Sequence, residues 1–235
     1  MQERPQRVPA HVAIARVLGT QIVTGAIAPG SLLPSENVYS VREGVSRSVI
    51  REAMRMLMSK RLIESRPKLG TRVRARCDWN LLDPDVLQWS FASTPDDQFV
   101  RDLFDLRLIL EPAAAALAAS NRDSHQLTLM ARALEKMARY GLATSEGLSA
   151  DQCFHDILFK ATGNALLANL SSSISAAVRW TTSFKYRNYP PRDPLPLHRD
   201  VFEALLSADP QAAKQAMATL VEQARLDTEA VLISR

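Results

Sequence analysis

The segment from Leu33 to Val73 constrains the fold of this chain more than any other stretch. It reads LPSENVYSVREGVSRSVIREAMRMLMSKRLIESRPKLGTRV. A short helical pattern ends at Glu43-Gly44, and a second helix begins at Ser46 with hydroxyl and guanidinium groups in its first turns. Helices that enter the major groove of DNA present such groups at this end. A basic hairpin with its tip at residues 66–70 follows, so the segment predicts a winged helix-turn-helix.

The second helix has one apolar and one polar face. Its polar face carries Arg47, Ser48, Arg51 and Arg55, which are predicted to point toward DNA. The opposite stripe is predicted to be buried and consists of Val49, Ile50, Ala53, Met54, Leu57 and Met58. A further helix is expected over 11–25, and Ser35 is expected to cap the helix that starts after Pro34.

Charge divides the chain in the same place as the motif. Residues 1–77 hold 14 Lys/Arg against 5 Asp/Glu, a net charge of +9, whereas residues 78–235 hold 15 against 20, a net charge of −5. Contacts with phosphates supply much of the affinity for DNA, and an acidic half does not contribute to them. Basic residues also solvate small domains, but here the excess coincides with the helix-turn-helix pattern. We therefore predict a DNA-binding domain over 1–77 and a separate domain over 78–235.

Composition excludes other classes. A hydrophobic fraction of 46% is typical of a globular protein, and no apolar run approaches the roughly 20 residues that span a bilayer. The N-terminus lacks the apolar core of a secretory signal, so a cytoplasmic protein without membrane contact is expected. Cys77 and Cys153 are far apart and form no CxxC pair, which favours two free thiols over a disulfide.

The second domain is predicted to be entirely helical. After Asn80 the strand signals disappear, and a short helix is expected over 83–90, starting at Asp83-Pro84. Longer helical patterns cover 96–119, where Pro112 is expected to bend or restart the helix, and then 123–140, 145–161, 164–187, 195–208 and 210–233. The segment 188–194 is expected to be a loop. The fold class is mainly α, with a winged helix-turn-helix followed by a helical bundle.

These motifs carry a family resemblance. The stretch LPSE…GVSRSVIREAMRMLMSKRLIESRPKLGTRV resembles the winged helix-turn-helix of the GntR transcription regulators. The helical half resembles the effector domain (the FCD domain) of their FadR-type branch, through residues 107–111, 151–155, Gly163-Asn164 and His198. The block DWNLLDPDVLQW, residues 78–89, is similar to that of regulators of sugar-acid operons in this branch, galactonate operons in particular.

The resemblance implies a set of residues that contact DNA. They are Ser35, Ser46, Arg47, Ser48 and Arg51 in the helix-turn-helix, with Lys68 and Gly70 in the wing. Two positions depart from the family pattern. Asn37 stands where an arginine usually touches DNA, which shifts the expected contacts toward the second helix and the wing. Glu43 stands where an apolar residue usually packs, and because a buried lone carboxylate is costly, we expect it to point outward or to find a partner.

The resemblance also implies a divalent metal site in the helical half. Asp151 and His155 are one helical turn apart and share a face. In the family this face binds a metal together with two later histidines, of which His198 matches the first and Leu220 replaces the second. Three ligands with open positions can hold Zn²⁺ or another transition metal, to which a bound carboxylate can add. Spacing alone favours a hydrogen-bonded Asp–His pair with an unrelated His198.

Two further residues are candidates for binding an effector. Arg107 matches the position from which the family's first long helix projects a cation into the pocket, where it can clamp a carboxylate. The alternative for Arg107 is an intrahelical pair with Glu111, worth only about 0.3–0.5 kcal/mol. Trp180 lies within the helical pattern 164–187 and serves either as a pocket wall against sugar C–H groups or as ordinary core filling.

The sequence therefore predicts a homodimeric, effector-responsive repressor rather than an enzyme. Two DNA-binding domains are expected to bind an inverted repeat in double-stranded DNA, and a small carboxylate such as a sugar acid is expected to release them. A metal-dependent hydrolase built on Asp151, His155 and His198 is one alternative, but it lacks an evident general base. A DNA-binding protein that ignores ligands is the other.

Overall fold

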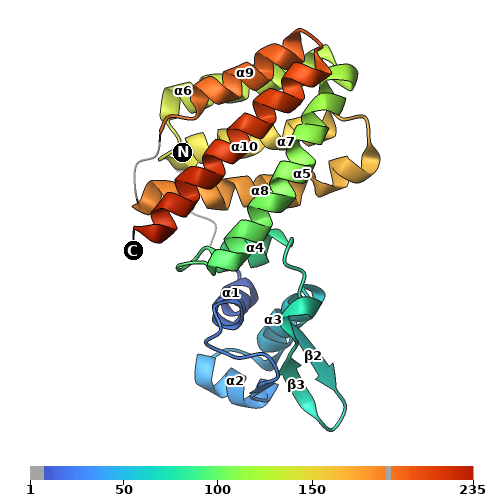
Figure 1. Ribbon diagram of the computed structural model, residues 1–235. Helices are drawn as coiled ribbons and strands as arrows, with labels where there is room; N and C mark the ends of the chain where they lie inside the picture. The colour runs from blue at the N-terminus through green and yellow to red at the C-terminus, as the bar shows by residue number, and fades with distance from the viewer. Residues whose placement is uncertain (1–7, 189–191, 235) are drawn as a thin grey trace, which may run out of the picture. The chain divides into compact units, whose positions relative to one another are not determined.

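The computed structural model describes residues 8–188 and 192–234, and its contacts divide the chain into two compact units, Met1–Thr94 and Pro95–Arg235. The fold is mainly α, as predicted (Figure 1). Part of the loop expected over 188–194 falls on residues 189–191, which lie outside the described residues.

The first unit is a winged helix-turn-helix, which confirms the prediction from the sequence. Its three short strands form one antiparallel sheet in the order β1-β3-β2, with Leu32 opposite Arg72 and Ile63 opposite Val73. Strand β1 was not expected, because two residues are too few to show a period. The elements are α1 (Ala10–Val23), β1 (Leu32–Leu33), α2 (Glu36–Glu43), α3 (Arg47–Ser59), β2 (Ile63–Arg66), β3 (Gly70–Val73), a 3-10 turn (Arg76–Asp78) and α4 (Pro84–Ser90).

Local sequence explains where α2 and α3 begin and end. The side chain of Ser35 accepts a hydrogen bond from Val38 N and caps α2, and Gly44 ends this helix with a left-handed φ of 65°. Helix α3 buries Ile50, Ala53, Met54 and Leu57, while Val49 is half-buried. The prediction that Met58 is buried is wrong. Its side chain lies at the edge of the apolar stripe and is 36% exposed.

Helix α4 packs within the first unit. A Cβ on Gly19 of α1 would lie 2.2 Å from Trp89 Cζ3, so only glycine lets α1 approach the indole of α4 this closely. At the end of α3, the ammonium of Lys60 lies 2.8 Å from Asp83 Oδ1 and 2.7 Å from Asp85 Oδ2. The segment 78–94, which the expected boundary after Cys77 assigned to the helical domain, thus packs against the DNA-binding elements.

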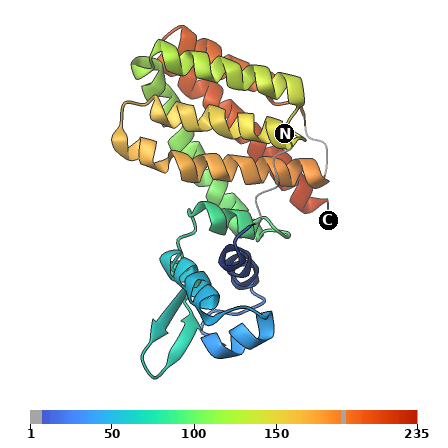
Figure 2. The same cartoon turned by 180° about the vertical axis from the view of Figure 1, so that it is seen from behind.

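The second unit is a helical bundle. Helices α6, α7 and α8 lie side by side in Figure 2, and Figure 1 shows α5 and α10 packed together on the opposite side of the bundle. Pro112 does not break α5, which runs through it to Asn121. The helices are α5 (Asp97–Asn121), α6 (Ser124–Tyr140), α7 (Ser145–Lys160), α8 (Ala165–Asn188), α9 (Leu195–Leu206) and α10 (Pro210–Ile233).

Three further observations concern the cysteines, Glu43 and the length of the helices. Cys77 and Cys153 are both free thiols on the surface. The carboxylate of Glu43 is exposed and lies 3.4 Å from Arg42 Nε, so it points outward with a partner. Among the described residues, no helix combines the length and the apolar character needed to cross a membrane.

Candidate functional site

The start of α3 presents a row of polar groups to solvent. Arg47 and Ser48 are exposed, and the Oγ atoms of Ser46 and Ser48 lie 2.8 Å apart. The Ser46 side chain also accepts from Val49 N at 3.4 Å and so caps the helix. A helix N-terminus with exposed hydroxyl and guanidinium groups suits both phosphates and base edges.

Arg51 is held by a residue that no sequence motif singled out. Its Nη2 lies 3.1 Å from Glu36 Oε2 on α2, and its Nε donates to the same carboxylate. This hydrogen bond and the negative charge of Glu36 raise the pKa of Arg51, which stays exposed on α3. Glu36 therefore fixes the direction of a guanidinium on the face expected to meet DNA. Fifteen residues separate the two, so no local pattern links them.

The wing carries its two candidate residues at the tip. Lys68 has a left-handed φ of 64° and Gly70 has a φ of 82°, and both are exposed. Gly70 has no neighbour near the position of a Cβ, so its backbone conformation, rather than space, favours glycine there. The turn is closed by the Leu69 N–H, which donates to Arg66 O at 3.1 Å. A lysine and a glycine at the tip of a hairpin can reach a phosphate backbone or a minor groove.

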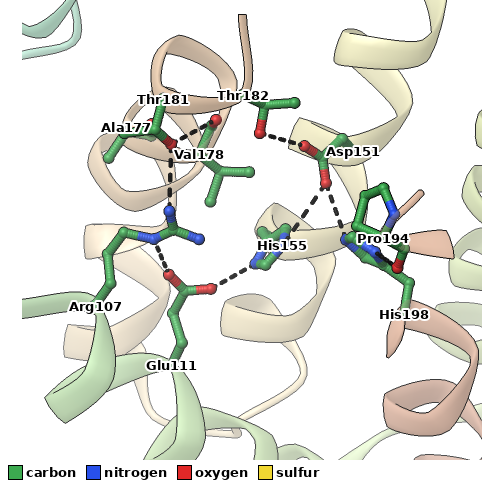
Figure 3. A network of polar contacts seen from close by, with 10 residues as sticks. All are labelled: Arg107, Glu111, Asp151, His155, Ala177, Val178, Thr181, Thr182, Pro194 and His198. Atoms are coloured by element: carbon green, nitrogen blue, oxygen red, sulfur yellow. Dashed lines mark hydrogen bonds and ion pairs between the residues drawn. The ribbon is translucent and has the colours of Figure 1, made fainter. Parts of the chain in front are cut away.

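The three metal-ligand candidates of the second unit converge on one buried point. His198 Nε2 lies 3.0 Å and His155 Nε2 lies 3.7 Å from Asp151 Oδ1 (Figure 3). Asp151 and His155 come from α7 and His198 from α9, and each is at most 2% exposed. One ligand atom from each residue lies within 4.8 Å of the others, so the three can hold one metal ion. The structure thus brings together residues that are far apart in sequence.

A second layer of polar groups orients these side chains (Figure 3). His198 Nδ1 lies 2.9 Å from Pro194 O, and His155 Nδ1 lies 2.6 Å from Glu111 Oε2, although without hydrogen-bond alignment. Thr182 donates its hydroxyl to Asp151 Oδ2 at 3.1 Å. Both imidazoles therefore turn Nδ1 toward an acceptor and Nε2 toward Asp151. Histidine ligands of metals are commonly oriented in this way.

Glu111 and Arg107 form a buried pair beside His155. Arg107 Nε lies 2.5 Å from Glu111 Oε1, and Arg107 Nη1 donates to Thr181 Oγ1 at 3.3 Å. Burial alone would raise the pKa of Glu111, but the charges of Arg107 and His155 outweigh it and lower the pKa to about 2. Glu111 is therefore a buried carboxylate anion between the guanidinium of Arg107 and the imidazole of His155. The intrahelical pair expected as the alternative for Arg107 does form, in the core rather than on the surface.

The donor and acceptor groups of this cluster fit a metal ion. Burial would raise the pKa of Asp151, but the hydrogen bond and charge of His198, with His155 and Lys185, lower it to about 2. Both ring nitrogens of His198 face oxygens that only accept, whereas a neutral imidazole has a single N–H. A metal bound at Nε2 would remove this mismatch between the ring and the two oxygens. A divalent cation satisfies Asp151, His155 and His198 together.

Trp180 and Leu220 make no polar contact with this cluster. Trp180 is half-buried, with the guanidinium of Arg179 5.7 Å from its ring. At about 100° per residue, it is on the face of α8 opposite to Thr182 and Lys185, which point inward. Leu220 is buried on α10 and lines a neighbouring cavity together with Lys185 and Pro194.

An exposed helix-turn-helix in one unit and a buried charged site in a second, all-helical unit define the class: a DNA-binding transcription regulator. Residues 11–73 match the bacterial regulatory proteins of the gntR family, and residues 102–223 match the FCD domain. The chain belongs to the GntR family of transcription regulators, in the group with an FCD domain.

Named relatives are also transcription regulators. The galactonate operon transcriptional repressor of Escherichia coli is 34% identical over 210 residues, which is 88% of this chain and 92% of that protein. The Glc operon transcriptional activator of E. coli is 28% identical over 73% of this chain and 68% of its own length. Lar of Listeria monocytogenes has a similar fold, with a TM-score of 0.67 at 17% identity, covering 97% of this chain and 99% of that one.

Proposed function

We propose that this protein is a homodimeric repressor of an operon for the catabolism of a sugar acid or a related carboxylate. In this proposal the helical unit binds the carboxylate at a metal held by Asp151, His155 and His198, and binding releases the operator. The single observation that carries it is the convergence of these three side chains on a buried point, in a chain 34% identical to a galactonate operon repressor.

The first unit supplies the contacts with the operator. Arg47 and Ser48 at the start of α3 and Arg51, held by Glu36, are placed to reach base edges and phosphates in the major groove. Lys68 and Gly70 extend the contact to the backbone beside the groove. A twofold-symmetric dimer places two such units on the halves of an inverted repeat.

The second unit supplies the sensor. When bound, the metal gives a carboxylate and a neighbouring hydroxyl of the effector a Lewis-acidic anchor in its open positions. Asp151 and the two histidines would hold the metal. Glu111 and Pro194 O face the Nδ1 atoms of the two imidazoles and so orient the rings. Arg107 neutralises Glu111 and stays close to the proposed effector site.

Coupling between the units follows from the chain path. Glu111 and Arg107 belong to α5, the first helix after the segment that leads out of the DNA-binding unit. An anion bound near His155 changes the charges that act on this helix. The effector alters DNA affinity only by the difference between its affinities for the two conformations.

Two measurements on the purified protein test this proposal. Metal analysis by plasma mass spectrometry should find about one transition-metal ion per chain in the wild type and none in the variant His198→Ala. The matched control is His125→Ala, a surface histidine whose loss should leave the metal content unchanged.

Fluorescence anisotropy with the chain's own upstream DNA then tests regulation. Affinity should fall when sugar acids such as galactonate or gluconate are added, and neutral polyols should have no effect. An unchanged affinity across the panel would identify a DNA-binding protein that ignores ligands. Turnover of a substrate that disappears in His155→Ala would identify a metalloenzyme instead.

A further inference from the structure

A small cavity lies between the loop before α9 and the helices α8, α9 and α10. Its volume is about 210 Å³. This is below the roughly 300–1,000 Å³ of sites for drug-sized ligands, so it suits a small metabolite. Its polar wall contains Lys185, Arg192, Asp193, Gln223 and Asp227, and its apolar wall contains Pro194, Leu197, Leu220 and Ala224.

Lys185 is the unusual member of this wall. Its side chain, on α8, is only 4% exposed, yet within the described residues no hydrogen bond or ion pair engages its ammonium. Asp151 and Asp227 act on it only through longer-range charge interactions. A buried ammonium without a hydrogen-bond partner is costly to a fold, so an anion that binds there would offset this cost.

We propose that Lys185 binds the carboxylate of the effector in this cavity. The inference rests on the proposed function and adds to it the residue that recognises the anion. A cation that is largely buried and lines a cavity has lost much of its hydration, so an incoming carboxylate gains a strong charge-assisted hydrogen bond.

The rest of the cavity indicates the kind of carboxylate. Gln223 Nε2 donates to Asp227 Oδ1 at 2.8 Å, and the remaining lone pairs of this pair can accept hydroxyl groups. Leu197, Leu220 and Ala224 offer surface for C–H groups. A charged end that faces hydroxyl acceptors fits a polyhydroxylated carboxylate better than a fatty acid.

Leu220 explains why a lysine is useful here. In the family pattern a fourth metal ligand falls at this position, and leucine cannot supply it. Lys185 lines the same cavity as Leu220 and interacts electrostatically with the metal-ligand candidate Asp151. The cavity next to the metal-ligand candidates therefore has a cation of its own, Lys185, where a fourth metal ligand is missing.

The charge state of Lys185 suits this role. Burial and then the positive charge of Arg107 lower the pKa of Lys185 to about 8, although the charges of Asp151 and Asp227 act in the opposite direction. At neutral pH the side chain still carries its proton. Because nearby negative charges offset the Lys185 ammonium only in part, an anionic ligand should stabilise this ammonium more than it would stabilise the ammonium of a surface lysine.

Isothermal titration of the full-length protein with galactonate, gluconate and the neutral polyol galactitol tests the proposal. Lys185→Met removes the charge and keeps the length of the side chain, and Lys214→Met on the exposed side of α10 is the matched control. Titrations before and after dialysis against EDTA separate a carboxylate held by the metal from one held by the lysine.

The wild type and Lys214→Met should bind at least one of the two acids more tightly than galactitol. Lys185→Met should weaken binding of that acid by about 10- to 150-fold, the loss of one hydrogen bond to a charged group, in both metal states. It should leave galactitol binding unchanged. Lys185→Arg, which retains a cation, should keep more of the affinity than Lys185→Met. It also tests the proposal if the Met variant does not fold.

The two failures are distinguishable. Equal affinity of wild type and Lys185→Met for the acid overturns the role of Lys185 and leaves the proposed function intact. The role of Lys185 is also overturned if Lys185→Arg recovers no affinity while remaining folded. A wild type that binds neither acid overturns the proposed function and the role of Lys185 with it.

Discussion

Removing one member of the buried pair Arg107–Glu111 should destabilise the helical unit strongly. The residues are 2% and 0% exposed, so Arg107→Met leaves Glu111 as a buried carboxylate with only His155 beside it. Breaking a buried pair in this way costs about 3–5 kcal/mol, whereas an exposed pair at the same spacing contributes about 0.3–0.5 kcal/mol. The structure thus raises the expected effect about tenfold over the value for a surface pair.

Urea denaturation of the wild type, Arg107→Met, Glu111→Gln and the double variant measures this effect. Each single variant should lose several kcal/mol, and the melting temperature should fall by about 10 °C, taking about 2–4 °C per kcal/mol. The double variant should be more stable than either single variant, because no uncompensated charge remains.

The same series separates the two roles considered for Arg107. If the double variant recovers stability and still responds to galactonate, Arg107 is a structural partner of Glu111. If stability returns and the response is lost, Arg107 also contacts the effector. Single variants that lose less than about 1 kcal/mol would refute the reasoning from burial.

Three other expectations concern the remaining sites. Leu220→His should restore the fourth ligand of the family pattern and tighten zinc binding at least tenfold in a competition titration with a chelating dye; an unchanged affinity would show that residue 220 does not face the metal. Lys185 has a folded pKa of about 8, below its ordinary 10.5, so the unfolded chain binds more protons between these values and stability should rise with pH across that window. The gain in the free energy of unfolding across this window is about 3 kcal/mol, at about 1.4 kcal/mol per pKa unit. Urea midpoints measured from pH 7 to 10.5 should therefore rise in the wild type relative to Lys185→Met. In that variant Arg107, Asp151 and Asp227 face no titrating ammonium. Arg47→Ala should weaken operator binding by about 1–3 kcal/mol. If Arg47 reads a base, the variant should also change the base preference; if it contacts a phosphate, only the dependence of affinity on salt concentration should change. Binding measured in parallel to operator and unrelated DNA decides between the two.

Local signals in the sequence were sufficient for most elements of the first unit. Ser35 and Ser46 are capping residues, Gly44 ends α2, and the alternation around residues 66–70 marks a hairpin, so each element follows from its own residues. Strand β1 was not predicted, because its pairing partner, β3, lies about 40 residues further along the chain. Met58 was misplaced because a helical period does not define how far the core reaches around a helix.

The site in the helical unit was only partly visible in the sequence. Asp151 and His155 share a face by spacing, and the family pattern added His198. The contribution of Glu111 depends on burial, which an i,i+4 interval does not reveal. Lys185 approaches the cavity from α8 through tertiary packing alone, and no motif marks it.

Trp180 is a candidate from the sequence that the structure places on another face of its helix. Its place in a helix near the site made it a candidate for the pocket wall, but the phase of α8 decides which residues face inward. Thr182 and Lys185 are 6% and 4% exposed, whereas Trp180 is half-buried beside Arg179. A shift of one or two positions along a helix moves a side chain to another face.

The affinity for operator DNA, measured by fluorescence anisotropy with and without sugar acids, tests the central claim most directly. We predict that metal-loaded wild type binds its operator with a dissociation constant at least tenfold higher in millimolar galactonate or a related aldonate. His198→Ala should lose most of this response while still binding DNA. A dissociation constant that no sugar acid or other carboxylate changes would contradict the proposal of a carboxylate-responsive repressor.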